Sequence, residues 1–216
     1  DPGREDDPSL QYVYGLALVR GNRVSEAEPV FARLLARHGD TAELNVLLGQ
    51  AHAQQGDYDA AIQSLKRALE LKPDVAEANA SLGVIYLKQG RLPEAEGSLA
   101  AELKGHPSDY KSAHNLATVL DRQGRPQEAL ALLRGVLKAR PDFADARYLF
   151  GKVLLAQGAA EEAARHLEAA AQLAPEDANI HYQLGQAYQK LGRTGAAREQ
   201  FEVFQKLKDK RRGGAS

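Results

Sequence analysis

The side chains best suited to acid–base or metal chemistry are the six histidines, and they form no recognisable site in the sequence. No two of them have the HExxH spacing that places two ligands on one face of a helix. The chain has no cysteine, which excludes zinc–thiolate sites, a thiolate nucleophile and disulfides. We therefore predict no metal site and no cofactor.

The carboxylates and glycines give no catalytic pattern either. No pair of acids stands out in an apolar setting, as an acid/base dyad would. There is no GxSxG nucleophile motif and no glycine-rich phosphate-binding loop. The sequence therefore predicts that the chain is not an enzyme.

The composition and charge argue against nucleic acid as a partner and against insertion into a membrane. The 216 residues include 28 basic and 29 acidic side chains, a formal net charge of −1, so no global field attracts nucleic acid. No apolar run approaches the roughly 20 residues that span a bilayer, and the acidic N-terminus is unlike a signal peptide. The chain also lacks methionine, which we interpret as a segment or processed product of a longer protein. Its Ala-, Gly- and Arg-rich composition is typical of a GC-rich bacterial genome.

Three columns of residues recur with a period of 34 and indicate six internal repeats. Small residues lie at Gly15, Gly49, Gly83, Ala117, Gly151 and Gly185. Alanines lie at Ala27, Ala61, Ala95, Ala129, Ala163 and Ala197. Residues that end helices lie at Gly39, Pro73, Pro107, Pro141 and Pro175. Small side chains of this kind let two helices cross closely, so each repeat is predicted to be a helical hairpin.

The pattern predicts twelve helices and no strand. First helices are expected near 8–20, 42–55, 76–89, 110–123, 144–157 and 178–191, and second helices near 24–38, 58–71, 92–105, 126–139, 160–173 and 194–210. Pro29 lies early in the second helix of repeat one and predicts a kink or a late helix start there, because proline removes one backbone hydrogen bond.

The order Leu-Gly, Tyr, Ala, Leu, Pro resembles the tetratricopeptide repeat, and repeat three carries it as Leu82-Gly83, Tyr86, Ala95, Leu99 and Pro107. This resemblance implies an all-α fold, a right-handed tetratricopeptide superhelix or α-solenoid. The repeats are expected at 8–41, 42–75, 76–109, 110–143, 144–177 and 178–210. Residues 1–7 are expected to be a disordered segment or a linker, and residues 211–216 a disordered tail.

In this family the first helices line a concave groove, and the resemblance implies which positions face it. The candidate ligand-groove residues are Tyr12, Arg20, Gln50, Gln54, Lys88, Lys111, His114, Arg122, Tyr148, Lys152, Tyr182, Gln186 and Lys190. Inward acids include Glu43, Glu77, Asp121 and Asp145. The Lys/Asn pattern with which some relatives read acidic chaperone tails is absent, which argues against that ligand. The alternative interpretation is a solvated helix face.

Two further features have structural interpretations. Glu102 occupies a column that is apolar in the other repeats, and we interpret it as a carboxylate that reaches water at the helix edge; a charged pocket or hinge is the alternative. His166 and His181 are interpreted as surface residues, and His52 as packed.

The predicted function is a protein–protein interaction scaffold that binds a protein or an extended peptide in the groove. One alternative is a structural spacer or self-association module whose ends pair with each other. Another is the substrate-recruiting arm of an enzyme whose catalytic domain lies outside this chain.

Overall fold

The computed structural model describes residues 8–21 and 23–213, and this part of the chain forms twelve α-helices and no strand. Their bounds are α1 Pro8–Arg20, α2 Val24–His38, α3 Ala42–Gln55, α4 Tyr58–Leu71, α5 Ala78–Lys88, α6 Leu92–Gly105, α7 Tyr110–Arg122, α8 Pro126–Ala139, α9 Ala144–Ala156, α10 Ala160–Leu173, α11 Ala178–Lys190 and α12 Thr194–Gly213. The predicted all-α hairpin fold is confirmed.

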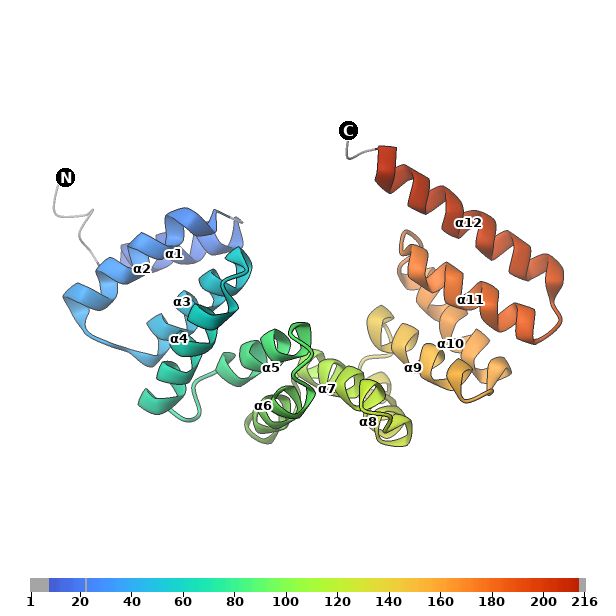
Figure 1. Cartoon of the computed structure of the whole chain (residues 1–216), viewed down its shortest axis with the longest axis horizontal. Helices are drawn as coiled ribbons and strands as arrows, with labels where there is room; N and C mark the ends of the chain where they lie inside the picture. Colours follow the sequence, from blue (N-terminus) through green and yellow to red (C-terminus); the bar gives the residue numbers. More distant parts are fainter. Residues whose placement is uncertain (1–7, 22, 214–216) are drawn as a thin grey trace. The chain divides into compact units, whose positions relative to one another are not determined.

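The chain divides into two compact units, residues 1–112 and 113–216. In the first unit, α1 packs on α2, α3 on α4 and α5 on α6; in the second, α9 packs on α10 and α11 on α12 (Figure 1). Within each unit, second helices also pack on the first helix of the following repeat: α2 on α3, α4 on α5, α8 on α9 and α10 on α11. Each unit is therefore a stack of hairpins.

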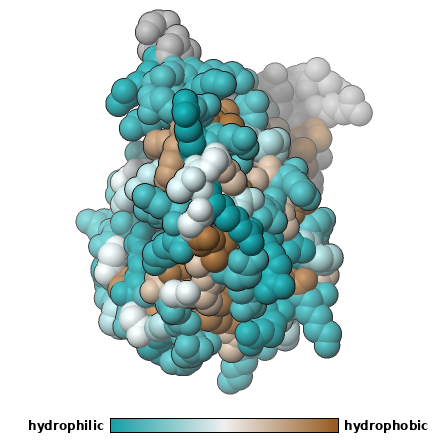
Figure 2. Space-filling model, turned by 90° about the vertical axis from the view of Figure 1, so that its right-hand side faces the viewer, coloured by the Kyte–Doolittle hydropathy of each residue, from teal (hydrophilic) through white to brown (hydrophobic). Residues whose placement is uncertain are grey.

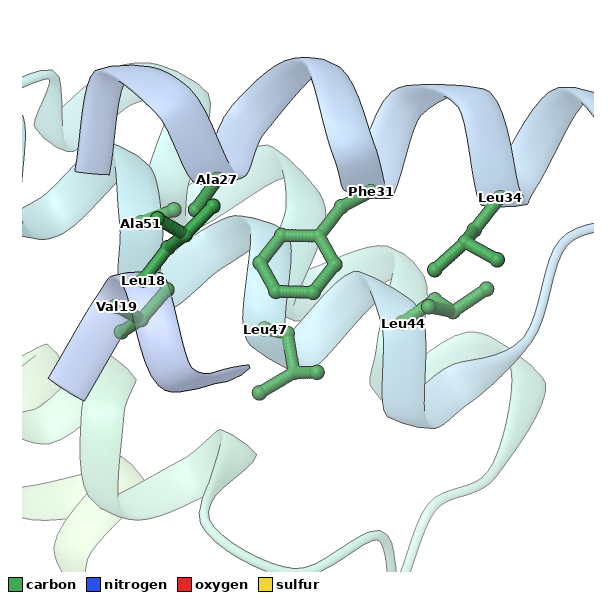
Figure 3. Packing of buried hydrophobic residues seen from close by; sticks show 8 residues of the cluster. All are labelled: Leu18, Val19, Ala27, Phe31, Leu34, Leu44, Leu47 and Ala51. Carbon is green, nitrogen blue, oxygen red and sulfur yellow. The ribbon is translucent and has the colours of Figure 1, made fainter. Parts of the chain in front are cut away.

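Helix crossings in the stack are close because one partner is glycine. A Cβ added to Gly49 would lie 2.6 Å from Leu65 Cγ, and one added to Gly185 would lie 2.6 Å from Phe201 Cε1. The side chain from the second helix fills the space left open by the glycine, and Leu65 is completely buried. Figure 3 shows the next interface in the stack, between repeats one and two, where Phe31 and Leu34 of α2 lie against Leu44 and Leu47 of α3.

One expected late helix start is absent, and two helix bounds differ from the prediction by two or more residues. α2 begins at Val24, so the late start expected from Pro29 does not occur; the proline is accommodated inside the helix. α12 continues to Gly213, so residues 211–213 are helical although they were assigned to the tail. α5 begins at Ala78, two residues later than expected, because Glu77 adopts a left-handed conformation with φ 68°.

The late start of α5 is coupled to Glu102 of α6. The Glu102 side chain is 5% exposed, so the interpretation of a carboxylate that reaches water is wrong. Its Oε2 accepts a hydrogen bond from the backbone N–H of Ala80 at 3.2 Å, and its Oε1 lies 2.8 Å from His106 Nδ1. Ala80 is in the first turn of α5, where backbone N–H groups have no partner within the helix. Glu102 therefore caps α5 from the neighbouring helix.

Two histidines also differ from expectation. His181 is 8% exposed, and its ring nitrogens lie 2.8 Å from Gln200 Oε1 and 2.9 Å from the backbone oxygen of Pro175. His166 is half-buried and its ring lies against that of Phe150, with centroids 4.4 Å apart. The interpretation of both as surface residues is therefore wrong, and both hold hairpins together.

Candidate functional site

The C-terminal unit has a cavity of about 500 Å³ on its first helices. All the side chains that line it come from α9 and α11, namely Lys152, Leu155, Ala156, Gln183, Gln186, Gln189 and Lys190. Three of these residues were candidates from the sequence, Lys152, Gln186 and Lys190. The cavity combines two ammonium groups and three amides with the apolar side chains of Leu155 and Ala156, which suits a ligand that carries hydrogen-bond acceptors beside apolar groups.

Hydrogen bonds hold the polar groups of this cavity in place. Lys152 Nζ lies 3.2 Å from Asp121 Oδ2, and Lys190 Nζ donates to the backbone oxygen of Leu155 at 3.1 Å. Gln186 Nε2 donates to the hydroxyl of Tyr182 at 3.1 Å. Each ammonium has three N–H donors, so these contacts orient the lysines and still leave donors for a ligand.

The three candidate tyrosines of the groove, Tyr12, Tyr148 and Tyr182, are less exposed than the sequence suggested. Tyr182 is 39% exposed, and its ring lies 5.2 Å from that of Phe204. Tyr148 and Tyr12 are half-buried, and burial raises the pKa of Tyr148 above its usual value. Tyr12 packs against the core of the N-terminal hairpins. Tyr12 and Tyr148 therefore contribute to packing, and Tyr182 is the most exposed of the three tyrosines.

The N-terminal unit has its own cavity, of about 580 Å³. Its lining comes from α1, α3 and the segment before α5, namely Tyr12, Leu16, Val19, Glu43, Val46, Leu47, Gln50, Gln54, Lys72, Val75, Ala76 and Glu77. Two polar pairs cross it: Lys72 Nζ to Glu43 Oε1 at 3.2 Å, and Gln50 Nε2 to Glu77 Oε2 at 2.8 Å. Its apolar floor and paired rim differ from the lysine-rich cavity of the other unit.

Other candidates lie outside both cavities. Lys88, with its ammonium 5.9 Å from the ring centroid of Tyr58, and Lys111 are exposed in the N-terminal unit. His114 packs on Phe143 with ring centroids 5.6 Å apart, and its burial lowers its pKa. Arg122 is exposed in the last turn of α7. The side chain of Arg20 lies outside the described residues.

Sequence reasoning missed several lining residues. Gln183 of the C-terminal cavity lies outside the groove positions that the family resemblance implies. Gln189 lies at one of those positions but was not singled out, and Lys72 belongs to the end of a second helix. Glu43, Glu77 and Asp121 were recognised as inward acids, but their cross-repeat partners were not. These partners could have been predicted by searching for a polar residue about 30 positions from each inward acid, because the contacts join neighbouring repeats.

No group of three or more His, Cys, Asp and Glu side chains within the described residues could hold a metal ion. No helix in residues 8–21 and 23–213 is both long and apolar enough to cross a bilayer.

Stacked hairpins with a first-helix cavity in each unit define an α-solenoid. One family model of the tetratricopeptide repeat matches residues 12–75, 54–110 and 114–178, and a second model of the same repeat matches residues 154–206. The chain belongs to the tetratricopeptide repeat family. Comparison with curated proteins gave no significant match.

Solved structures agree with this assignment. PilF of Pseudomonas aeruginosa has a TM-score of 0.84 at 15% identity, over 95% of this chain and 93% of that one. MamA of Desulfovibrio magneticus RS-1 has a TM-score of 0.71 at 24% identity, over 80% of this chain and 97% of that one. YrrB, described as a tetratricopeptide-repeat protein with an unusual peptide-binding site, has a TM-score of 0.66 at 22% identity, over 82% and 91%. At these identities the likeness is one of fold. Proteins of this family are generally non-catalytic scaffolds for protein–protein interaction.

Proposed function

We propose that the chain binds an extended peptide segment of a protein partner on the first helices of its repeats. The observation that carries this proposal is the cavity between α9 and α11, where Lys152, Gln186 and Lys190 converge. Glutamine amides can both donate to and accept from a peptide backbone. Asp121 balances the charge of Lys152, and Lys190, which donates to a neutral backbone oxygen, adds a positive charge that favours a segment with acidic residues.

The chemistry of the cavity matches a peptide better than a small molecule. Only Leu155 and Ala156 of its seven lining residues have apolar side chains, and its polar groups lie along two helices. Small-molecule sites are mostly apolar and enclose most of the ligand's surface. A line of amides and ammonium groups instead suits the repeating carbonyls of an extended chain. Tyr182 beside Gln186 adds an aromatic surface with a hydroxyl, a common feature of peptide contacts.

The N-terminal cavity supports a second point of contact. Its apolar floor, which includes Leu16, Val46 and Val75, suits an aliphatic or aromatic side chain. Lys72 and Glu43 balance each other's charge, whereas Glu77 accepts a hydrogen bond from the neutral Gln50 and leaves one negative charge on the rim, so contact there does not favour an acidic segment as it does in the C-terminal unit.

Peptide-display selection on the immobilised chain, followed by fluorescence anisotropy with the selected peptides, tests the proposal. We expect the double variant Lys152→Ala/Lys190→Ala to weaken binding by at least about 1 kcal/mol, roughly fivefold, the scale of an interface hot spot. The double variant Lys138→Ala/Lys206→Ala removes the same charge from exposed positions on α8 and α12 and is the matched control. Equal weakening by both variants, or no selected peptide at all, would contradict binding in this cavity.

A further inference from the structure

The first helix leaves an apolar stripe exposed. In α1, Leu10 is 48% exposed, Val13 60% and Tyr14 52%, and Ala17 is also exposed. Their spacing of three, four and seven residues places them on one face of the helix. Single exposed apolar residues are ordinary, but a continuous stripe of them marks an interaction surface.

The next repeat shows what covers this face elsewhere in the chain. A shift of 34 residues converts the stripe into Leu44, Leu47, Leu48 and Ala51 of α3. Leu44 is 6% exposed, Leu47 7% and Ala51 0%, and they share one core cluster with Phe31 and Leu34 of α2 (Figure 3). The exposed stripe on α1 therefore has the residue positions of the first-helix half of a repeat-to-repeat interface, and in the next repeat the other half is a second helix.

The matching half is present on α12. Phe201 and Phe204 lie five repeats after Phe31 and Leu34, in the same two columns. Phe31 is 0% and Leu34 2% exposed, whereas Phe201 and Phe204 are only half-buried. In the four intervening repeats the first column is completely buried, at Leu65, Leu99, Leu133 and Leu167.

The two terminal hairpins also share a detail that the others lack. Phe201 packs on Gly185 just as Phe31 packs on Gly15, while the other repeats place leucine in this column. The face of the C-terminal unit in Figure 2 is mostly hydrophilic, with hydrophobic side chains visible between the hydrophilic ones. Lys208, whose ammonium lies 5.5 Å from the Phe204 ring centroid, adds charge beside this surface.

We propose that a second copy of this chain docks its α12 on the exposed face of α1. The contact would reproduce the α2–α3 interface, with Phe201 and Phe204 of one copy against Leu10, Val13 and Tyr14 of the other. It is head-to-tail, so each copy keeps one free end and the association continues along a row of copies. Gln200 and Gln205 replace Val30 and Leu35 at the edge of this interface, so the contact buries less apolar surface than the internal one and association is weaker.

Sedimentation equilibrium of the whole chain, from micromolar to millimolar concentration, tests the proposal. The average mass is expected to rise above that of one chain as concentration increases. Val13→Glu places a charge in the stripe at a position that is 60% exposed, so the variant is expected to fold and to remain at the mass of one chain. Leu173→Glu changes a leucine that is 45% exposed on α10, and is expected to associate like the unchanged chain.

A mixing experiment distinguishes the head-to-tail contact from a symmetric one. Val13→Glu keeps a functional α12 and Phe204→Glu keeps a functional α1, so each alone is expected to be a single chain and an equal mixture to form a pair of the two. Circular dichroism checks that Phe204→Glu keeps its helices; if it does not, Gln205→Glu, at the position that corresponds to Leu35, replaces it. A single-chain mass for the unchanged protein at every concentration, dimers of Phe204→Glu alone, or an equal loss with Leu173→Glu would overturn the proposal.

Discussion

Replacing Glu102 by alanine tests whether the cap on α5 stabilises the third repeat. Alanine fits this column, because Ala68 and Ala170 occupy it in α4 and α10. The substitution therefore removes two interactions without introducing a clash. It leaves the N–H of Ala80 without its partner and separates the carboxylate from His106.

The expected loss can be worked out from these two contacts. Loss of a side-chain cap typically costs about 1 kcal/mol. The contact with His106 adds at most about 1 kcal/mol, because the His106 side chain is 44% exposed and solvent screens the pair. We therefore expect the hairpin α5–α6 to become less stable by about 2 kcal/mol, which corresponds to roughly 30-fold faster opening of its amides.

Hydrogen exchange of the peptide that covers residues 78–82, read by mass spectrometry, is the direct assay. A repeat array opens locally, so exchange there is more informative than a global melting temperature. Lys104→Ala, at an exposed position on the same helix, is the control and should leave this exchange unchanged. Unchanged or slower exchange in Glu102→Ala would refute the reasoning, because it would mean that burying the carboxylate costs as much as the cap contributes.

Two other predictions concern packing and pH. Gly83→Ala would place a Cβ 2.7 Å from Leu99 Cδ2 and should lower the free energy of unfolding by about 1–3 kcal/mol. Gly97→Ala meets nothing within 4 Å and should raise it by about 0.5–1 kcal/mol; urea titration compares the two, and an equal loss would contradict the close-packing account. Burial lowers the pKa of His114 and of His166, so the folded state binds fewer protons than the unfolded state as pH falls through about 6.5. Stability contributed by these residues is present above that pH and lost below it; thermal melts should decline more between pH 7 and 5 for the unchanged chain than for a His114→Leu/His166→Leu variant, and parallel declines would refute this.

The hairpin fold was predictable because its determinants are periodic. Columns such as Gly49 and Gly83 recur every 34 residues, and a glycine that faces Leu65 or Leu99 reports a close helix crossing directly. Helix ends were predictable wherever glycine or proline marked them. They were missed at α5, where the start depends on Glu77 and on a carboxylate from another helix.

The candidate site was predictable only in part. Lys152, Gln186 and Lys190 share a cavity because α9 and α11 repeat the same register. The burial of Tyr12, Tyr148 and His181 depends on the neighbours that each meets, and a single column of residue types does not contain that information. Glu102 was misjudged for the same reason, since its partner Ala80 is 22 positions away on another helix.

The polar contacts between successive repeats have a consequence for how such a chain can change its length. In the described residues, side-chain hydrogen bonds that join one repeat to the next connect residues no more than 35 positions apart, as Tyr188 to Glu168 and Lys190 to Leu155 do. Each contact thus concerns adjacent repeats alone. Loss or duplication of one 34-residue segment would remake a single junction and leave the others as they were. Gene rearrangement can therefore lengthen or shorten this kind of scaffold without a new fold having to arise.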